Sequence, residues 1–419
     1  MIDVRLLRDD PDGVATALAR RGYARDEVDR IIALEASHRS LVSDVDAARA
    51  AHKDSSQGIG KASAEQRPAM IERAAAFKQQ VSDLEEALAT ASADFDAAFL
   101  AVPNLPHPDA PDGFEGDGIV LRTVGTKPTF DFEVRDHVDL MEPAGALDTV
   151  RAVKVSGARF AYLKGEAVLL ELALVRYAMD VAMRHGHTPI IPPVLVREEA
   201  MFGTGFFPTD EQQIYATRDD DLYLVGTAEV PVAGMHMDEI FDEADLPLRY
   251  AGFSTCFRRE AGTYGKDTRG IFRVHQFDKV ELFAFVTPDN SSEEHERLLS
   301  IEEELLGGLG LHYNVVDIPV GDLGASAARK FDIEAWLPGQ DAYRELTSCS
   351  NTTDYQARRL KCRVRTDDGN VPVHTLNGTA IAMSRTIIAL VETHQRADGS
   401  VLVPPALQPY LGQEVLFAR

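Results

Sequence analysis

The sequence predicts an α+β fold, with an antiparallel β-sheet flanked by helices as its main body and a two-helix antiparallel coiled-coil arm in its N-terminal part. Three observations support this prediction. Apolar residues recur at heptad spacing in two long segments before residue 100. A hairpin-like stretch from Cys256 to Phe285 joins two runs of β-forming residues. The 419 residues, with 45% hydrophobic content, are sufficient for a large mixed core beside a thin arm.

The two heptad segments predict two long helices. Residues 54–68 between them, DSSQGIGKASAEQRP, are rich in Ser and Gly, and Pro68 suits the first turn of the second helix. The helices should therefore fold back on each other over about 40 Å. The seam positions are Ile31, Leu34, His38, Leu41, Val45 and Ala48 in the first helix, and Met70, Ala74, Phe77, Val81, Leu84, Leu88, Ala91, Phe95 and Ala98 in the second.

Charge along the predicted arm is uneven. Residues 26–100 carry fourteen acidic and eight basic side chains, so the arm as a whole is a poor surface for nucleic acid. Six of the basic residues gather around the predicted turn, where phosphate contact would be local. A solvated coiled coil used for protein contact is the alternative interpretation. The six residues are Arg49, Lys53, Lys61, Arg67, Arg73 and Lys78.

A proline-rich stretch marks a domain boundary. Residues 101–118, AVPNLPHPDAPDGFEGDG, contain four prolines and several acidic residues, which favour an extended linker or hinge. The sequence therefore predicts an N-terminal domain over residues 1–105, a linker over residues 106–118 and a main domain over residues 119–419.

The stretch from Cys256 to Phe285 carries the clearest chemical signal. Side chains of a strand alternate between faces, so Arg273, Phe277 and Glu281 are expected on one face of a strand from Phe272 to Phe285. Arg258 and Glu260 are expected on one face of the preceding strand. Arginine forks match phosphate oxygens, an aromatic ring can stack on a purine, and a carboxylate accepts hydrogen bonds from an ammonium or hydroxyl. This pattern predicts a surface that binds a nucleotide.

The connection between these two runs is polar and rich in glycine. Ala261–Gly270 reads AGTYGKDTRG, which is too long for a tight hairpin turn and predicts a mobile loop. The alternative for the whole stretch is an ordinary charged hairpin with a cross-strand Arg–Glu pair.

The segments FRRE, AGTYGKDTRG and FRVHQFDKVE together resemble the second signature motif of class II aminoacyl-tRNA synthetases, in the form found in the seryl-tRNA synthetase family. The resemblance extends over the whole chain. It implies that Arg258 holds the α-phosphate of ATP, Phe277 stacks on adenine, Glu260 contacts the adenine end and Glu281 lies in a serine pocket. It also places Arg259, Arg273 and Val274 at the ATP site.

Residues 221–230, DLYLVGTAEV, form a short apolar run that ends in Thr227-Ala228-Glu229. The resemblance assigns these three residues, together with Arg258, to serine binding. The alternative is a strand end at which Thr227 acts only as a cap.

Residues 343–351, YRELTSCSN, resemble the segment with which the family holds ATP through four consecutive residues, Glu345, Leu346, Thr347 and Ser348. Glu345 and Ser348 are also implied as ligands of Mg²⁺ bound with ATP. Oxygen ligands suit that hard cation, and substrate phosphates and water supply its remaining ligands.

Residues 375–390, TLNGTAIAMSRTIIAL, predict an apolar helix that begins after the Asn-Gly-Thr segment and carries Arg385 about two turns in. A buried arginine needs a partner, and a triphosphate is a suitable one. The resemblance makes Arg385 the γ-phosphate contact and places Thr379 near the serine hydroxyl. The alternative for Thr379 is a helix cap.

Together these implications describe a serine–tRNA ligase. Serine would attack the α-phosphate of ATP, pyrophosphate would leave, and the serine would pass to tRNA(Ser), and to tRNA(Sec) where that tRNA exists. Positioning and charge stabilisation, with Arg258, Arg385 and Glu345 as the catalytic residues, would dominate the first step without a general base. The arm would bind the tRNA. Residues 169–196 resemble the family's first signature motif, which implies that Pro193 lies at a homodimer interface. The alternative for this segment is a core helix followed by a strand.

Two other functions remain open on the sequence. The chain could activate serine or another small amino acid for a carrier other than tRNA, although the long arm weighs against this. It could also be a catalytically silent RNA-binding relative, but Arg258, Phe277, Glu345 and Arg385 are all present. The glycine-lysine loop of P-loop nucleotidases and the signatures of class I synthetases do not occur.

Composition limits the kinds of partner and the cellular compartment that suit the chain. A formal net charge of -24 argues against general nucleic-acid affinity. Cys256, Cys349 and Cys362 show no paired metal-ligand spacing, and disulfides are not expected. The first residues, MIDVRLLRDDPDG, lack an apolar targeting segment, and no later run is long enough to span a membrane. A cytoplasmic enzyme is expected.

Overall fold

The structure is a computed structural model that describes residues 1–262, 265, 267, 269–367 and 369–418. Its chain forms two compact units, Ile2–Leu105 and Pro106–Arg419, the second of which also includes Met1. Each unit has buried apolar residues of its own.

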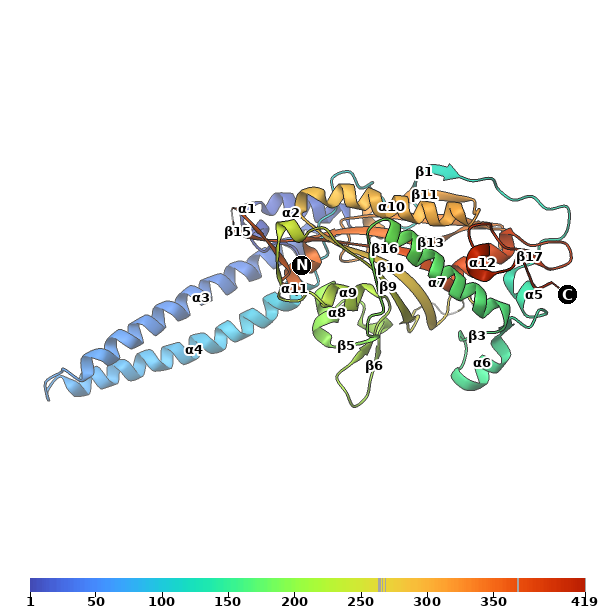
Figure 1. The fold of residues 1–419 in the computed structure, drawn as a ribbon. Coiled ribbons are helices and arrows are strands. Elements are labelled where there is room, and N and C mark those ends of the chain that lie inside the picture. The colour runs from blue at the N-terminus through green and yellow to red at the C-terminus, as the bar shows by residue number, and fades with distance from the viewer. Residues whose placement is uncertain (263–264, 266, 268, 368, 419) are drawn as a thin grey trace. The chain divides into compact units, whose positions relative to one another are not determined.

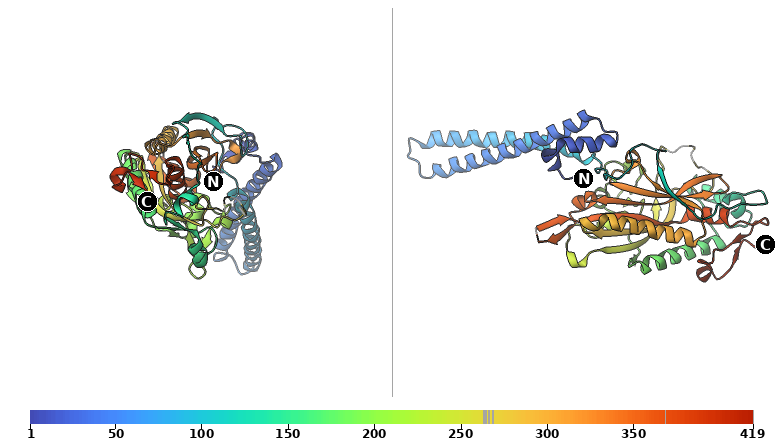
Figure 2. Two further views of the ribbon diagram at one scale, coloured as in Figure 1. Left: turned by 90° about the vertical axis from the view of Figure 1, so that its right-hand side faces the viewer. Right: turned by 90° about the horizontal axis from the view of Figure 1, so that it is seen from above.

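The first unit is built on two long antiparallel helices, which run side by side in every view (Figures 1 and 2). Val45, Ala48, Ala74 and Phe95 are buried between them, while most other seam positions are half-buried, as expected for a bundle of only two helices. The predicted coiled coil is confirmed. The helices of this unit are α1 (Leu6–Asp9), α2 (Pro11–Arg20), α3 (Arg25–Ile59) and α4 (Arg67–Leu100).

The connection between the long helices is shorter than predicted. Helix α3 continues through the Ser-Ser-Gln segment and ends at Ile59, since serine and glutamine cost a helix little and only Gly60 interrupts it. Helix α4 starts at Arg67, with Pro68 in its first turn as predicted.

The second unit contains an eight-stranded sheet in the order β1-β11-β12-β13-β16-β10-β9-β4. All its neighbouring strands pair antiparallel except β4 and β9, so the predicted antiparallel sheet is confirmed with one parallel edge. The strands are β1 (Ile119–Val124), β4 (Thr188–Ile190), β9 (Leu248–Phe257), β10 (Gln276–Val286), β11 (Tyr313–Asp317), β12 (Arg329–Leu337), β13 (Ala342–Thr353) and β16 (His374–Ala382).

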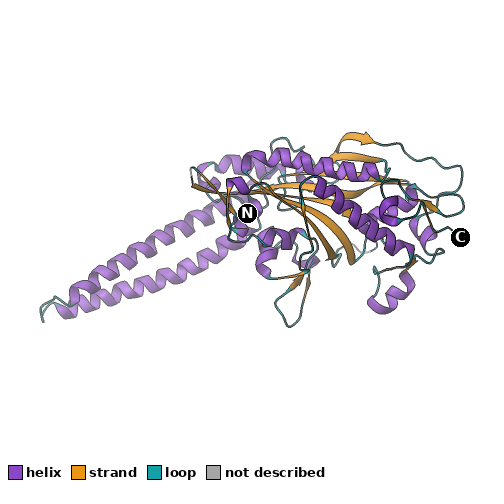
Figure 3. Cartoon of the chain, viewed as in Figure 1, coloured by secondary structure: helices purple, strands orange, loops and turns teal. Residues whose placement is uncertain are grey.

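Helices cover both faces of this sheet (Figures 1 and 3). Leu282 and Ala284 of β10 pack into the main core with α7 (Glu166–Arg184), α10 (Ser291–Gly308) and α12 (Met383–Thr393). The intervening Phe283 and Phe285 pack on the other face with α9 (Glu229–Gly234) and α11 (Tyr355–Leu360). Alternation along one strand therefore explains the two layers.

Short elements complete the unit. The helices are α5 (His137–Met141), α6 (Thr149–Ser156), α8 (Glu198–Thr204) and α13 (Gln408–Leu411). The strands are β2 (Leu147–Asp148), β3 (Tyr162–Leu163), β5 (Leu195–Val196), β6 (Tyr215–Ala216), β7 (Tyr223–Leu224), β8 (Ile240–Asp242), β14 (Arg363–Thr366), β15 (Gly369–Pro372), β17 (Val401–Leu402) and β18 (Val415–Leu416).

Two predicted strand boundaries are wrong. Strand β9 ends at Phe257, so Arg258 and Glu260 lie beyond it, and β10 starts at Gln276, so Arg273 precedes it. Glu260 has a φ of 51°, and Gly262, Gly265 and Gly270 also have positive φ, which breaks an extended strand. Of the predicted mobile loop, Thr263, Tyr264, Lys266 and Thr268 lie outside the described residues.

The helix predicted after Asn377-Gly378-Thr379 begins three residues later than expected. Ala380–Ala382 still belong to strand β16 (His374–Ala382), and the helix begins at Met383, so Thr379 lies within a strand and Arg385 lies in the first turn of α12 rather than two turns in. The apolar run is continuous because β16 is a central strand, flanked by β13 and β10. Such a run cannot be distinguished from a buried helix by its periodicity.

None of the helices within the described ranges is both long enough and apolar enough to cross a lipid bilayer. All three cysteines are buried and free, and burial raises the pKa of the Cys349 thiol well above its usual value.

Candidate functional site

A cavity of about 370 Å³ opens on the sheet face that carries Phe277 and Glu281. Its wall has four cationic and four anionic side chains, which come from segments far apart in the sequence. Most of the residues singled out in the sequence lie in this wall. They are Thr227, Glu229, Arg258, Glu260, Arg273, Val274, Phe277, Glu281, Glu345, Leu346, Ser348, Thr379 and Arg385.

Two irregularities in the sheet aim side chains into the cavity. In β13 the pairing with β12 shifts at Leu346, so Glu345 and Ser348, three residues apart, both reach the cavity. In β16 the pairing with β10 shifts between Thr379 and Ile381, and Thr379 lies opposite Glu281. Bulges of this kind re-aim side chains near functional sites.

The closed end of the cavity holds two carboxyl groups and a lysine. Lys279 and Glu281, on one face of β10, are 5% and 1% exposed and form an ion pair. Asn377 Nδ2 donates to Glu281 Oε1 at 3.1 Å and to Glu229 Oε2 at 3.3 Å. Gln356 Nε2 donates to Glu229 Oε1 at 2.6 Å. The two carboxyl groups thus belong to one buried hydrogen-bonded network.

Glu229 starts helix α9, which approaches the sheet closely. A Cβ at Gly252 of β9 would lie 3.1 Å from Ala228 Cβ and 3.3 Å from Val232 Cγ2, so the glycine leaves room for the helix. Thr227 Oγ1 accepts a hydrogen bond from the Glu229 backbone N–H at 3.2 Å and so fixes the turn before the helix. Burial, followed by the nearby charge of Glu281, raises the pKa of Glu229 to about 7.

The open end of the cavity is lined by arginines and aromatic rings. Arg385 Nη1 donates to the Glu345 backbone oxygen at 2.8 Å, lies 3.6 Å from Glu345 Oε2, and its guanidinium stands 4.8 Å from the centre of the Phe272 ring. The Arg258 guanidinium stands 5.2 Å from the centre of the Phe277 ring. These contacts hold guanidinium groups beside flat apolar faces, an arrangement that suits phosphate and a purine.

Glu345 stays ionised in this setting. The protein atoms packed around its half-exposed carboxyl group oppose its ionisation, but the charges of Arg385, Lys330 and Arg258 outweigh this and lower the pKa of Glu345. Its carboxylate and the Ser348 hydroxyl are hard oxygen donors on one wall. No group of three or more His, Cys, Asp or Glu side chains in the described part of the chain could hold a metal ion by itself. A cation at Glu345 would therefore need oxygens from a bound substrate.

Glu260 and Arg273 form an ion pair across the ends of the loop between β9 and β10. Both side chains line the cavity, although neither lies on a strand as predicted. The loop ends are therefore joined at the cavity mouth by a charge-assisted hydrogen bond.

Three predicted residues lie outside this wall as the described residues define it. Ala228 is fully buried beneath α9, and Thr347 points to the other face of the sheet, where its Oγ1 donates to Glu302 Oε2 at 2.9 Å. Arg259 is exposed, and its backbone N–H donates to Gln213 at 2.9 Å. Their assignment to ATP or serine binding stays a prediction.

The sequence analysis missed two residues of the closed end. Lys279 and Asn377 each lie two positions before a predicted serine-pocket residue, Glu281 and Thr379 respectively. Strand alternation places residues at this spacing on the same face, and that signal could have identified both. Gln356, on α11, has no comparable signal.

The six basic residues around the turn of the arm are all exposed. Arg49 forms an ion pair with Glu85 across the two helices at 2.7 Å, and the Arg73 guanidinium stands 5.6 Å from the centre of the Phe77 ring. Exposure leaves these side chains accessible to a polyanion, as the prediction requires.

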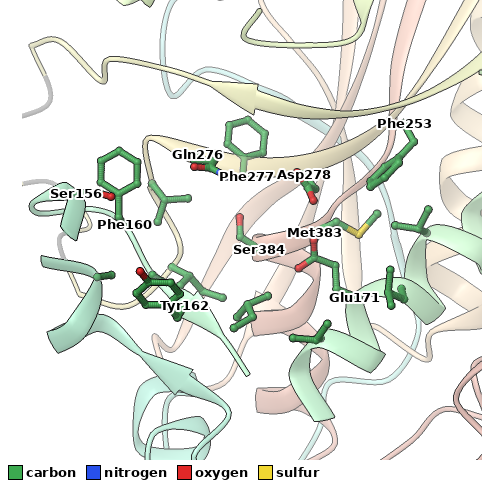
Figure 4. Close-up of a pocket in the computed structure, with 18 residues that line it drawn as sticks. Ser156, Phe160, Tyr162, Glu171, Phe253, Gln276, Phe277, Asp278, Met383 and Ser384 are labelled. Carbon is green, nitrogen blue, oxygen red and sulfur yellow. The ribbon is translucent and has the colours of Figure 1, made fainter. Parts of the chain in front are cut away.

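A second cavity, of about 490 Å³, lies behind Phe277 and shares Val274, Phe277 and Ser384 with the first. Figure 4 shows Glu171 of α7 and Asp278 of β10 pointing toward each other within it. Burial and the hydrogen bond to Asp278 raise the pKa of Glu171 to about 8. Because its described lining residues are largely apolar and include no lysine, arginine or histidine, this cavity is a poor site for a triphosphate.

The antiparallel sheet, and a first cavity with carboxyl groups at one end and arginines at the other, are those of a class II aminoacyl-tRNA synthetase. Residues 213–394 match the core domain of class II tRNA synthetases for G, H, P, S and T, and residues 1–106 match the seryl-tRNA synthetase N-terminal domain. The first match contains most of the cavity wall, and the second contains the arm.

Whole-chain comparisons identify the family. The chain is 52% identical to a serine–tRNA ligase of Nocardia farcinica, with 99% of each chain covered. The structure of a Pyrococcus horikoshii seryl-tRNA synthetase complexed with ATP superposes with a TM-score of 0.92 at 42% identity, covering 99% of both chains. A cytoplasmic serine–tRNA ligase of Naegleria fowleri in complex with AMP gives 0.87 at 34% identity, covering 99% of this chain and 98% of that one. The chain therefore belongs to the seryl-tRNA synthetase family of aminoacyl-tRNA ligases.

Proposed function

We propose that this chain activates L-serine with ATP to give seryl-adenylate and pyrophosphate, and then transfers the serine to the 3′ end of tRNA(Ser). One observation carries the proposal. A single cavity joins a buried end with two carboxyl groups to an open end lined by arginine and aromatic side chains. An adenylate has these same two halves, an aminoacyl group and a nucleotide.

The open end supplies the nucleotide contacts. Arg258 holds the α-phosphate, and Phe277 receives adenine on its ring face, with Glu260 and Arg273 at the adenine end. Arg385 holds the γ-phosphate from the first turn of α12. This assignment is supported by the two guanidinium–ring contacts and by the ATP and AMP complexes of the structural relatives.

ATP enters with Mg²⁺, for which Glu345 and Ser348 are the proposed protein ligands. The lowered pKa of Glu345 keeps this donor ionised. When bound, the cation supplies charge neutralisation to the phosphates. Because two oxygen donors leave most of the coordination shell to phosphates and water, the protein holds the cation only together with its substrate.

The closed end binds serine. Thr227 and Glu229 hold the ammonium group, Arg258 holds the carboxylate, and Glu281 with Thr379 hydrogen-bonds the hydroxyl. The pairing of Glu281 with Thr379 across β10 and β16 supports a shared hydroxyl contact. A pocket of this kind should reject alanine by about 10⁴ to 10⁵, because the buried polar groups would be left unpaired. Threonine is excluded only by the bulk of its methyl group, about 1–3 kcal/mol.

The chemistry of the first step needs little beyond placement. The serine carboxylate attacks the α-phosphorus in line, the bond to the β-phosphate oxygen breaks, and pyrophosphate leaves. Arg258 bridges the two reacting groups, so it orients the attacking carboxylate and stabilises charge on the α-phosphate. Arg385 stabilises the charge of the leaving pyrophosphate.

The function is tested by ATP–pyrophosphate exchange with serine, threonine, alanine or no amino acid, followed by charging of purified tRNA(Ser) and tRNA(Sec). Exchange and charging with serine are the expected results, with exchange on alanine weaker by about 10⁴-fold or more, and we expect both tRNAs to accept serine. Exchange without charging would favour a non-tRNA carrier, and no exchange by a folded protein that binds ATP would indicate a silent relative.

The raised pKa of Glu229 predicts a pH dependence of serine binding. Only ionised Glu229 can pair with the serine ammonium, and with a pKa of about 7 it is mostly protonated at pH 6 and mostly ionised at pH 8. Serine affinity should therefore fall roughly tenfold from pH 8 to pH 6. Calorimetry in two buffers of different ionisation heat should also show proton release on binding at pH 7. A flat profile would remove Glu229 from the ammonium contact.

We also propose that the exposed basic residues of the arm bind the tRNA. Simultaneous replacement of Lys53, Lys61, Arg67 and Arg73 by Ala should raise the KM for tRNA by roughly tenfold or more, because phosphate contacts are lost, with a weaker salt dependence. Serine-dependent exchange should stay within about twofold of the unmodified enzyme.

A double variant in helix α3, Arg30→Ala with Arg39→Ala, controls for loss of positive charge elsewhere on the arm. Its tRNA KM should barely change. Equal loss of tRNA charging and serine exchange in the fourfold variant would contradict separate sites for the two functions.

A homodimer is the third part of the proposal. Helix α7 buries one face in the core and leaves Val168, Leu169 and Leu172 between 40% and 58% exposed, and Ile191 after β4 is 82% exposed. Pro193 is also exposed. Large apolar side chains left exposed on a helix in this way suit a protein interface.

Light scattering at micromolar concentration should give twice the chain mass of 45.9 kDa. Leu169→Glu with Leu172→Glu should shift the protein toward the single-chain mass. Leu402→Glu, at a side chain 48% exposed on β17, is the matched control and should not. A monomeric unmodified protein would refute the dimer.

A further inference from the structure

Lys279 is the one lysine in the described wall of the proposed serine and ATP cavity. It is 5% exposed, and its ammonium forms an ion pair with Oε2 of Glu281. Lysine is rarely buried to this extent unless it is paired. A buried ion pair contributes little net stability compared with apolar side chains of the same volume, so stability alone does not account for it.

The local sheet is built to accommodate this side chain. Lys279 lies opposite Ser254 on β9 and Ala382 on β16, and both are small residues. Because Lys279 and Glu281 are two positions apart on β10, their side chains extend from the same face. The lysine therefore reaches along its own strand to the carboxylate rather than outward to solvent.

The charges around Glu281 explain why a cation is needed there. Asn377 links Glu281 to Glu229, so two carboxyl groups share one buried hydrogen-bond donor. Without a cation, the two acids would repel each other in a site from which water is largely excluded. The charged and titratable groups that interact with this network are Lys279 and Glu281 on β10, Glu229 on α9, Arg258 and Cys256 at the end of β9, and Glu302 on α10 beneath the sheet.

We infer that Lys279 is a positioning residue that determines specificity for a hydroxyl-bearing amino acid, because it holds Glu281 as a charged acceptor aimed at the substrate hydroxyl. This inference rests on the proposed function of the cavity. Glu281 Oε2 is ion-paired with Lys279 and Oε1 accepts a hydrogen bond from Asn377, so both carboxylate oxygens are held by neighbouring side chains, and Thr379 lies opposite Glu281 in the register of β10 and β16. Lys279 acts through Glu281 and needs no contact with the substrate.

A double-mutant cycle tests this coupling. The variants are Lys279→Met, which keeps volume and removes charge, Glu281→Gln, and the two combined. Lys279→Met alone should lower kcat/KM for serine by roughly 10- to 100-fold in ATP–pyrophosphate exchange, chiefly through KM. Activation of alanine should change by less than about threefold, and the KM for ATP should be unchanged. In the Glu281→Gln background, Lys279→Met should lower kcat/KM for serine by less than about a further threefold, because the side chain at position 281 is already neutral.

Lys279→Gln serves as the second variant if Lys279→Met unfolds, since it keeps a hydrogen-bond donor and removes only the charge. Thermal unfolding of every variant separates loss of fold from loss of recognition. Additive effects in the cycle, or equal losses for serine and alanine, would overturn the role of Lys279 while leaving the proposed function intact. No serine-dependent exchange by the unmodified protein would instead overturn the proposed function, and this inference with it.

Discussion

The arrangement of the site depends on one constraint, the burial of Glu229, Lys279 and Glu281 at the closed end of a cavity. Charged groups that lose water must gain partners inside the protein, and each of these has at least one: Lys279 pairs with Glu281, Asn377 bridges the two acids, and Gln356 donates to Glu229. These partners come from β10, β16, α9 and α11, so the network forms only when the sheet and the helices on this face have packed together. Folding and substrate recognition are therefore linked through the same side chains.

The sheet provides the rigidity that such a network requires. Central strands β13, β16, β10 and β9 are held from behind by the core under α7, α10 and α12, and the site residues extend from the opposite face. Two bulges correct the strand alternation where Glu345, Ser348 and Thr379 must face the cavity. The nucleotide end, in contrast, is formed by loop ends and the first turn of α12, with more exposed side chains. The rigid closed end suits a small substrate that must be discriminated from similar molecules. The open end, which is lined by arginines, suits a larger and charged substrate.

Sequence patterns were sufficient for the fold class and the paired arm helices, because heptad spacing and strand alternation are local signals, and the resemblance of several motifs to a known family supplied most of the cavity wall. These patterns failed at positions where tertiary packing determines the local structure. The last three residues of the buried strand β16 could not be separated from the following helix by their apolar run, and the left-handed residue Glu260 ended a strand that composition favoured. The bulge at Leu346 and the contact of Gln356 with Glu229 depend on segments distant in sequence. Lys279 and Asn377 were visible by spacing, but their importance follows only from burial.

The central claim is that one end of the cavity binds serine and the other binds the nucleotide. The most direct measurement is a crystal structure with a non-hydrolysable sulfamoyl analogue of seryl-adenylate. We expect the serine hydroxyl within hydrogen-bond distance of Glu281, the ammonium near Glu229 and adenine against Phe277. An analogue bound in the second cavity behind Phe277, or in the first cavity with its two ends reversed, would contradict this arrangement.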